Sequence, residues 1–128
     1  MRIPPAILIV DDDAEARTEI VDLLSHAGYQ VTSVRSFEEA TKVLSTDPPD
    51  LLITELRLGA FNGLHLVIRS RGRRPEMAAI ILTSYRDSVL EAEAQRQGAA
   101  YVVKPVDHVA LLTIVSQRLG LRPEDEAP

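Results

Sequence analysis

The chain has 128 residues, 45% hydrophobic and 26% charged, with a net charge of −5 at pH 7; these values are typical of one soluble globular domain. It has no cysteine, which excludes disulfides and thiolate metal sites and makes a cytoplasmic location the expectation. The acidic balance argues against direct nucleic-acid binding by this domain, and no apolar run approaches the roughly 20 residues of a membrane helix.

The first predicted element is a buried strand. Residues 6–10 form a continuous apolar run, as expected of a strand that is covered on both faces. The run stops at three aspartates, and apolar residues at helical spacing then predict a helix that ends before Gly28. Asp12 with Glu15 three residues on resembles a capping box for this helix. Residues 30–34 alternate in polarity, which indicates an outer strand.

The middle of the chain repeats the pattern. Residues 36–39 form a clear capping box and open a helix that ends by residues 47–49, which contain two prolines. A second apolar run, residues 51–54, predicts another buried strand. Residues 57–63 are interpreted as a loop, and the helix after it carries Leu64, Val67 and Ile68 as its apolar residues.

The last third holds two more strands and two more helices. Residues 79–82 are a third apolar run and predict a central strand, followed by a weakly amphipathic helix over roughly residues 87–97. Residues 101–103 predict a short strand, and Asp107 can cap a final helix that Gly120 ends. Residues 122–128 are acidic and contain proline, which indicates a C-terminal tail or the start of a linker after a domain of residues 1–121.

Strands alternating with helices predict βαβ units, right-handed crossovers and a parallel sheet. The three apolar runs belong at the centre of that sheet, and the mixed second strand and the short fifth strand belong at its edges. This arrangement is a flavodoxin-like, doubly wound (βα)5 sheet of the α/β class with strand order 2-1-3-4-5.

Polar residues stand directly after four of the predicted strands. They are Asp11, Glu55, Thr83 and Lys104. Because ligands of open α/β sheets bind beyond the carboxyl ends of the strands, we expect these side chains to share one edge. Clustered carboxylates suit a hard divalent cation such as Mg²⁺, and a lysine and a hydroxyl beside it could hold phosphoryl oxygens.

Each of these residues also has a simpler structural role. Asp12 or Asp13 could cap the following helix and favour its dipole. Lys104 could form an ion pair with Glu55 and do nothing else. Tyr101 could be a half-buried packing residue. Their placement after successive strands favours a common site over these separate roles.

The same segments resemble the motifs of receiver domains in bacterial two-component response regulators. These motifs are residues 7–13, 49–55, 62–64, 81–85 and 98–105. They cover nearly all of residues 6–120, in the family's order and spacing. The resemblance implies a signalling module rather than an enzyme, in which the acid after the third strand accepts a phosphoryl group from a sensor histidine kinase or a phosphotransfer protein.

The resemblance also implies a role for each site residue. The ligands of a weakly bound Mg²⁺ would be Asp11, Asp12, Glu55 and the backbone carbonyl of Arg57. Thr83 would contact the phosphoryl group and act in the switch, and Lys104 would pair with the phosphoryl oxygens. Tyr101 would be the rotating aromatic residue that reports the state of the site. Pro105 would follow a cis peptide bond.

The chain departs from the family at the acceptor position, where the family carries aspartate and this chain carries Glu55. Residues 59–60 and Asn62 of the following loop are also atypical. The extra methylene moves the carboxylate by roughly one bond length, and displacements of about 1 Å can cost about a hundredfold in rate. We therefore expect impaired phosphorylation. Glu55 could imitate the phosphorylated state, form an inert ion pair with Lys104, or still be phosphorylated slowly.

Other functions are also considered. A Mg²⁺-dependent phosphohydrolase could use Asp11 and Asp13, but the chain lacks an inserted cap segment to enclose a substrate. A flavin carrier is disfavoured because three aspartates would repel a phosphate. A protein-interaction module that works without phosphorylation is a further alternative. The partner surface predicted here is the face of the fourth helix, fifth strand and fifth helix, with Tyr101 at its edge, for a homodimer or effector docking; no membrane partner is expected.

Overall fold

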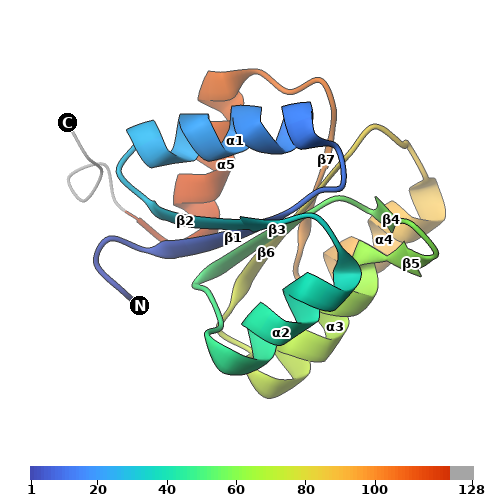
Figure 1. Cartoon of the computed structure of the whole chain (residues 1–128). Helices are drawn as coiled ribbons and strands as arrows, with labels where there is room; N and C mark the ends of the chain where they lie inside the picture. The colour runs from blue at the N-terminus through green and yellow to red at the C-terminus, as the bar shows by residue number, and fades with distance from the viewer. Residues whose placement is uncertain (122–128) are drawn as a thin grey trace.

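The structure is a computed structural model that describes residues 1–121; the predicted tail, residues 122–128, lies outside the described residues. Its centre is a five-stranded parallel sheet in the order β2-β1-β3-β6-β7 (Figure 1). These strands are β1 Ala6–Val10, β2 Gln30–Val34, β3 Leu51–Thr54, β6 Ala78–Thr83 and β7 Ala100–Val103. The fold class and the strand order predicted from the sequence are confirmed.

In residues 1–121, five helices cover the two faces of the sheet (Figure 1). They are α1 Ala14–His26, α2 Phe37–Thr46, α3 Gly63–Arg73, α4 Ser88–Arg96 and α5 His108–Arg118. Helices α1 and α5 pack on one face, and α2, α3 and α4 pack on the other. None of the helices in residues 1–121 is long and apolar enough to cross a membrane.

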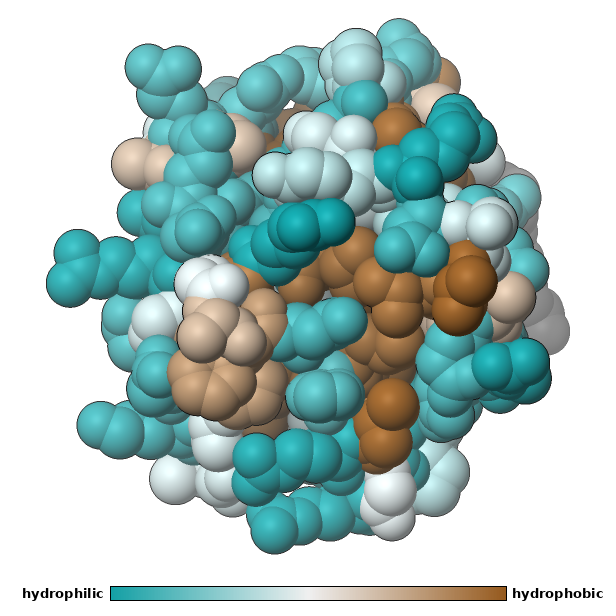
Figure 2. Space-filling view, turned by 90° about the vertical axis from the view of Figure 1, so that its right-hand side faces the viewer, coloured by the Kyte–Doolittle hydropathy of each residue, from teal (hydrophilic) through white to brown (hydrophobic). Residues whose placement is uncertain are grey.

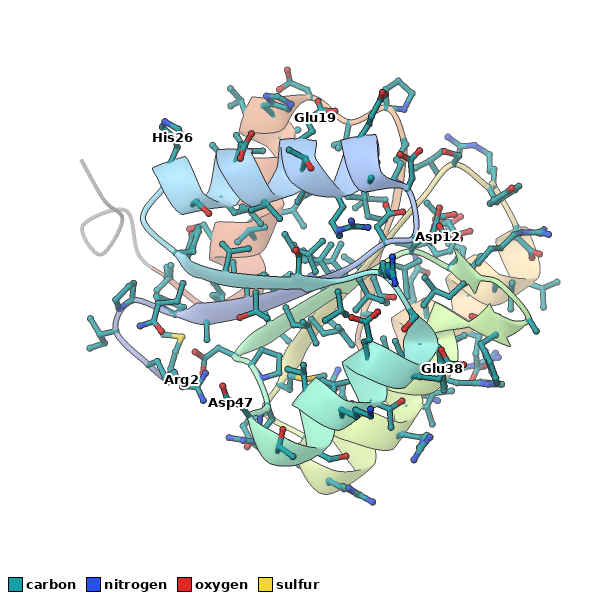
Figure 3. The ribbon with its side chains drawn as sticks, viewed as in Figure 1. Arg2, Asp12, Glu19, His26, Glu38 and Asp47 are labelled. Atoms are coloured by element: carbon teal, nitrogen blue, oxygen red, sulfur yellow. The ribbon has the colours of Figure 1, made fainter. Side chains whose placement is uncertain are left out.

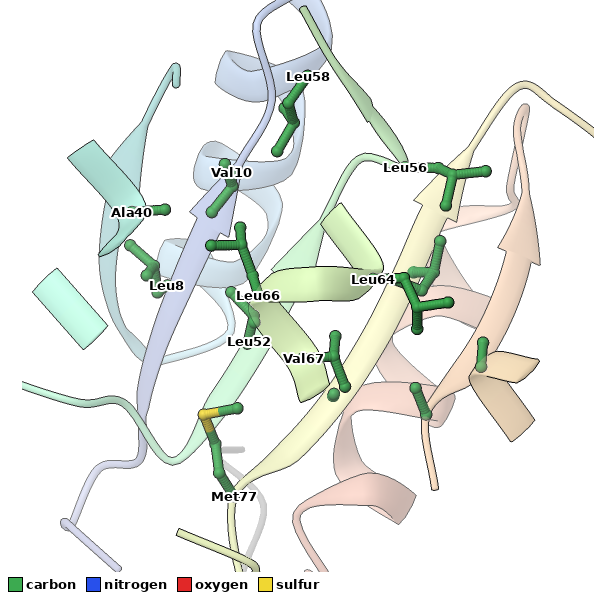
Figure 4. Packing of buried hydrophobic residues seen from close by; sticks show 14 residues of the cluster. Leu8, Val10, Ala40, Leu52, Leu56, Leu58, Leu64, Leu66, Val67 and Met77 are labelled. Atoms are coloured by element: carbon green, nitrogen blue, oxygen red, sulfur yellow. The ribbon is translucent and has the colours of Figure 1, made fainter. Parts of the chain in front are cut away.

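The side chains on the two faces of the central strands belong to two separate hydrophobic clusters. Leu8 and Leu52 point into the cluster below the sheet, which α3 completes with Leu66 and Val67 (Figure 4). Their neighbours along the strands, such as Ile7, point into the cluster with α1 and α5. Burial on both faces explains why the central strands read as unbroken apolar runs rather than alternating ones.

One local expectation is wrong, and two others become more specific. Residues 57–63 are not a plain loop, because Arg57–Leu58 (β4) and Phe61–Asn62 (β5) pair as a short antiparallel hairpin. The N-cap of α1 is Asp13 rather than Asp12, since Asp13 accepts hydrogen bonds from the backbone N–H groups of the first turn. Ile68 does not face the core: it is 37% exposed, whereas Leu66 takes the inward position.

Candidate functional site

The carboxyl edge of the sheet brings together Asp11, Glu55 and Lys104. The ammonium nitrogen of Lys104 lies 2.8 Å from Asp11 Oδ2 and 3.7 Å from Glu55 Oε1. The three side chains are only 8%, 9% and 19% exposed, in that order. The predicted convergence of the strand-end residues is therefore present for the two acids and the lysine.

The position of these residues follows from the strand ladder. Each is the first residue after its strand, and its backbone N–H extends the ladder by one bond to the neighbouring strand. Glu55 N–H donates to the Val10 carbonyl at 2.8 Å, and Lys104 N–H donates to the Thr83 carbonyl at 2.7 Å. Because parallel strands end at a common edge, these bonds fix the three backbones side by side and aim their side chains into one space.

The buried charges are compensated within the chain. Asp11 Oδ1 accepts from the Asp13 N–H at 2.9 Å, and Glu55 Oε2 accepts from the Leu56 N–H at 2.5 Å. Burial of the Lys104 ammonium would lower its pKa, but the hydrogen bond and charge of Asp11, with the charge of Glu55, outweigh burial and raise the pKa of Lys104. In residues 1–121, no buried side-chain nitrogen or oxygen lacks a partner.

Thr83 and Tyr101 meet at Tyr85 rather than at Glu55. The fully buried Thr83 hydroxyl accepts from the Tyr85 N–H at 3.2 Å, and the Tyr101 hydroxyl donates to the Tyr85 carbonyl at 2.5 Å. Burial, followed by the negative charge of Asp87, raises the pKa of the Tyr101 hydroxyl. The backbone of Tyr85 thus joins the two residues to which the resemblance gives switch roles.

The side chain of Tyr85 adds a contact that the sequence did not predict. The Arg57 guanidinium carbon lies 4.1 Å from the centroid of the Tyr85 ring, a cation–π geometry. The contact joins the β4–β5 hairpin to the segment between β6 and α4. No local pattern indicates a pair formed between two different loops, and Arg57 was expected to contribute only its backbone carbonyl.

The expected metal ligands are only partly assembled. Asp11 and Glu55 converge, but on the ammonium of Lys104; Asp12 is exposed, and Figure 3 labels it at the same edge of the sheet. Within residues 1–121, no group of three or more histidine, aspartate or glutamate side chains is placed to hold a metal ion. The oxygen donors have the chemistry that Mg²⁺ prefers, yet both buried carboxylates already pair with the single ammonium of Lys104.

Two backbone features frame the site. The Lys104–Pro105 peptide bond is cis, as the sequence analysis expected. Gly63, the first residue of α3, approaches β3 so closely that a Cβ atom would lie 2.1 Å from the Glu55 carbonyl oxygen. Only glycine fits there, so the start of α3 is held directly against the backbone of Glu55.

The surface around the site is partly apolar. Figure 2 faces the carboxyl edge and shows brown apolar atoms gathered between teal polar side chains. Phe61 of the hairpin stacks on Phe37 with 4.6 Å between ring centroids. On the predicted partner face, Val89 of α4 is 73% exposed. Val109 of α5 is 71% exposed, but it lines a groove with the end of α1 and the N-terminal segment.

Residues 7–116 match the family model of the response regulator receiver domain. The chain is 34% identical to the response regulator protein FleR of Pseudomonas aeruginosa, over 94% of this chain and 26% of that protein. It is 33% identical to the acid tolerance regulatory protein ActR of Sinorhizobium medicae, over 93% of this chain and 62% of that protein. It therefore spans less than two thirds of either relative. A CheY-like response regulator receiver domain protein from Methanospirillum hungatei superposes with a TM-score of 0.86 at 27% identity, over 91% of this chain and 94% of that one.

Proposed function

The chain belongs to the response regulator receiver domain family of two-component signalling, and from this premise we propose that its switch is set by Glu55 and not by phosphorylation of an aspartate. The carrying observation is the position of the Glu55 carboxylate, 3.7 Å from the Lys104 ammonium. A permanent carboxylate beside this lysine can supply part of the charge that a transferred phosphoryl group would bring.

The environment of Glu55 argues against efficient phosphorylation. The side chain is 9% exposed, and one carboxylate oxygen accepts from the Leu56 N–H at 2.5 Å. Attack on a phosphodonor needs an oxygen that is free and correctly aimed, and displacements of about 1 Å can cost about a hundredfold in rate. Both oxygens of Glu55 are instead directed at groups of the chain itself.

The imitation we propose is partial. Within residues 1–121, the Glu55 carboxylate has Leu56 N–H and Lys104 as its partners, while the Thr83 hydroxyl is engaged with the Tyr85 N–H. Glu55 therefore imitates the contact of a phosphoryl group with Lys104 but not its contact with Thr83. A two-state domain of this kind is biased toward one state but still responds to a partner that prefers either.

Mg²⁺ and the partners belong to the same proposal. Asp11, Asp12, Glu55 and the Arg57 carbonyl would hold Mg²⁺ weakly, in competition with Lys104. Bound Mg²⁺ would supply neutralisation of the carboxylates and orientation of phosphoryl oxygens. A sensor histidine kinase or phosphotransfer protein is the proposed upstream partner, one that Glu55 could have made vestigial.

The downstream surface we propose is the face of α4, β7 and α5. Val89 is an exposed apolar residue of α4 on that face, and an exposed apolar residue suits contact with a second copy of the domain or an effector. Light scattering at high concentration tests self-association: we expect a dimer that Tyr101→Ala weakens. A strictly monomeric profile unaffected by Tyr101→Ala would count against the proposal.

The phosphohydrolase alternative has less support. It needs a free aspartate nucleophile at Asp11 or Asp13, but Asp11 is bound to Lys104 and Asp13 accepts from the first turn of α1. Their carboxylates are committed to structural bonds.

The deciding experiment is labelling by a small phosphodonor. The chain, Glu55→Asp and Glu55→Gln are incubated with acetyl phosphate and Mg²⁺, and their intact masses are measured. We expect a phosphoryl adduct on Glu55→Asp alone. A stoichiometric adduct on the unaltered chain would overturn the proposal. The NMR chemical shifts of Tyr85 and Tyr101 then distinguish a Glu55 that imitates phosphorylation from one that has no effect on the switch. If Glu55 imitates phosphorylation, these chemical shifts should change in Glu55→Gln.

A further inference from the structure

A small groove lies between α2 and α3, away from the Glu55 site. Its volume is about 150 Å³, and its lining includes Leu44, Leu66 and Met77. Leu66 and Met77 are 2% exposed and belong to the hydrophobic cluster below the sheet (Figure 4). An apolar cavity of about this volume can hold a group as large as benzene. The floor of the groove therefore suits one apolar side chain.

The rim of the groove is basic. Residues 69–74 contain four arginines in a chain whose net charge is −5. Three of them, Arg69, Arg73 and Arg74, line the groove. Helix α3 contains no aspartate or glutamate, so its own residues leave this charge uncompensated. The groove thus joins an apolar floor to a positive rim.

The arginines differ in what they already bind. Arg71 donates to the Gln97 carbonyl at 2.6 Å and to the Pro75 carbonyl at 2.9 Å, and Arg74 forms an ion pair with Glu76. Arg69 and Arg73 are exposed and have no hydrogen-bond or ion-pair partner among residues 1–121. These two guanidinium groups are available to a binding partner.

We propose that the α2–α3 groove docks an acidic peptide segment of another protein, with one apolar side chain inserted between the arginines. Charge complementarity selects the acidic flanks through Arg69 and Arg73. The floor of Leu44, Leu66 and Met77 selects the apolar anchor.

A peptide fits the groove better than a nucleic acid does. Phosphodiester groups are bound by arginines together with hydroxyl and backbone donors. Two of the three hydroxyls that line the groove are occupied: Thr41 donates to the Phe37 carbonyl at 2.9 Å and Ser45 to the Thr41 carbonyl at 2.8 Å. A sugar–phosphate backbone also has no apolar group to cover the floor.

The test is fluorescence anisotropy of the full chain with a labelled pentapeptide that has one central leucine between acidic residues. We expect binding that weakens with added salt. Arg69→Ala/Arg73→Ala should weaken it about three- to tenfold, because two exposed ion pairs contribute about that much. The matched control, Arg35→Ala/Arg86→Ala, removes the same charge from exposed positions outside the groove and should weaken binding less than about twofold.

Three outcomes would overturn the proposal. Equal losses in the two double variants would show attraction by overall charge alone. Equal binding of a peptide with glycine in place of leucine would remove the role of the floor. Tighter binding of a short DNA duplex, with the same dependence on Arg69 and Arg73, would replace the peptide by a nucleic acid. None of these results depends on Glu55, so the proposal stands or falls separately from the switch.

Discussion

Two regions of the molecule differ in the burial and pairing of their positively charged side chains. At the carboxyl edge, Lys104 is largely buried and lies between two carboxylates of the same chain. At the α2–α3 groove, Arg69 and Arg73 are exposed, and neither has a partner within residues 1–121. One cation is part of a closed intramolecular site, and the other two are open to solvent.

Burial accounts for the difference. Removing a charge from water costs several kcal/mol, so a buried ion persists only with partners built into the fold. An exposed arginine keeps its hydration and gains about 0–1 kcal/mol from a surface pair. Any functional change at the carboxyl edge must therefore rearrange ion pairs that already exist. A partner at the α2–α3 groove can instead form new ion pairs.

Gly63→Ala should damage the closed region most. The new Cβ would meet the Glu55 carbonyl oxygen at 2.1 Å and Thr54 Oγ1 at 2.7 Å. Because the first contact is with backbone, relief requires α3 to move away from β3, and we expect the free energy of unfolding to fall by about 3 kcal/mol. Urea denaturation followed by circular dichroism measures it. Gly72→Ala is the control: its Cβ meets nothing within 4 Å, and it should stabilise α3 by about 0.5–1 kcal/mol.

Lys104→Met tests the closed ion cluster itself. The variant keeps the length of the side chain but leaves Asp11 and Glu55 as two buried carboxylates without their shared cation. Breaking a buried pair costs about 3–5 kcal/mol; since Lys104 is 19% exposed, we expect a loss of about 2 kcal/mol. Lys42→Met, at an exposed position on α2, should change stability by less than about 0.5 kcal/mol.

The pH dependence of stability gives an independent measure of the same cluster. The pKa of Lys104 is raised above the ordinary 10.5, so folding holds its proton more tightly than the unfolded chain does. The corresponding stability is complete below pH 10.5 and is lost as the pH rises through the raised pKa of the folded state. Above about pH 10.5, the chain should therefore lose stability more steeply than Lys104→Met. Parallel curves would contradict this assignment.

Much of the closed region could be predicted from the sequence because position along the chain determines it. A continuous apolar run predicts a central strand, and the residue after each run must lie at the carboxyl edge. Asp11, Glu55 and Lys104 meet for that reason alone. The cap of α1 could not be chosen the same way, since Asp12 and Asp13 are chemically identical neighbours and only backbone geometry selects Asp13.

The α2–α3 groove and the contacts between loops had no comparable signal in the sequence. The Arg57–Tyr85 pair joins two loops whose approach depends on the β4–β5 hairpin, which lies in a segment interpreted as a plain loop. The arginine run of residues 69–74 could be recognised in the sequence. The sequence did not indicate which of these arginines bond to other residues of the chain and which do not. That division depends on where the Gln97 carbonyl lies relative to Arg71, which is a fact of tertiary packing.

Tyr101→Phe should have a smaller effect than either substitution above. It removes the hydroxyl that donates to the Tyr85 carbonyl at 2.5 Å, and a hydrogen bond of this kind contributes about 1 kcal/mol. Urea denaturation should show that loss. Ultraviolet titration should also lose the tyrosine whose pKa is raised. Tyr85→Phe is the control, because the ring over which Arg57 lies is retained, and it should cost less than about 0.5 kcal/mol.

Arg69→Ala/Arg73→Ala should change stability least, although it removes two full charges. Arg73 favours the dipole of α3 by about 0.3 kcal/mol at an exposed helix end, and alanine offsets this loss by its higher helix propensity. We expect the free energy of unfolding to change by less than about 0.5 kcal/mol. Arg71→Ala, from the same run, should cost about 1–2 kcal/mol, because the two carbonyls it now serves would lose a charged donor. If the double variant instead lost as much stability as Lys104→Met, the groove arginines would be structural cations, and a partner could recruit them only by breaking bonds of the fold.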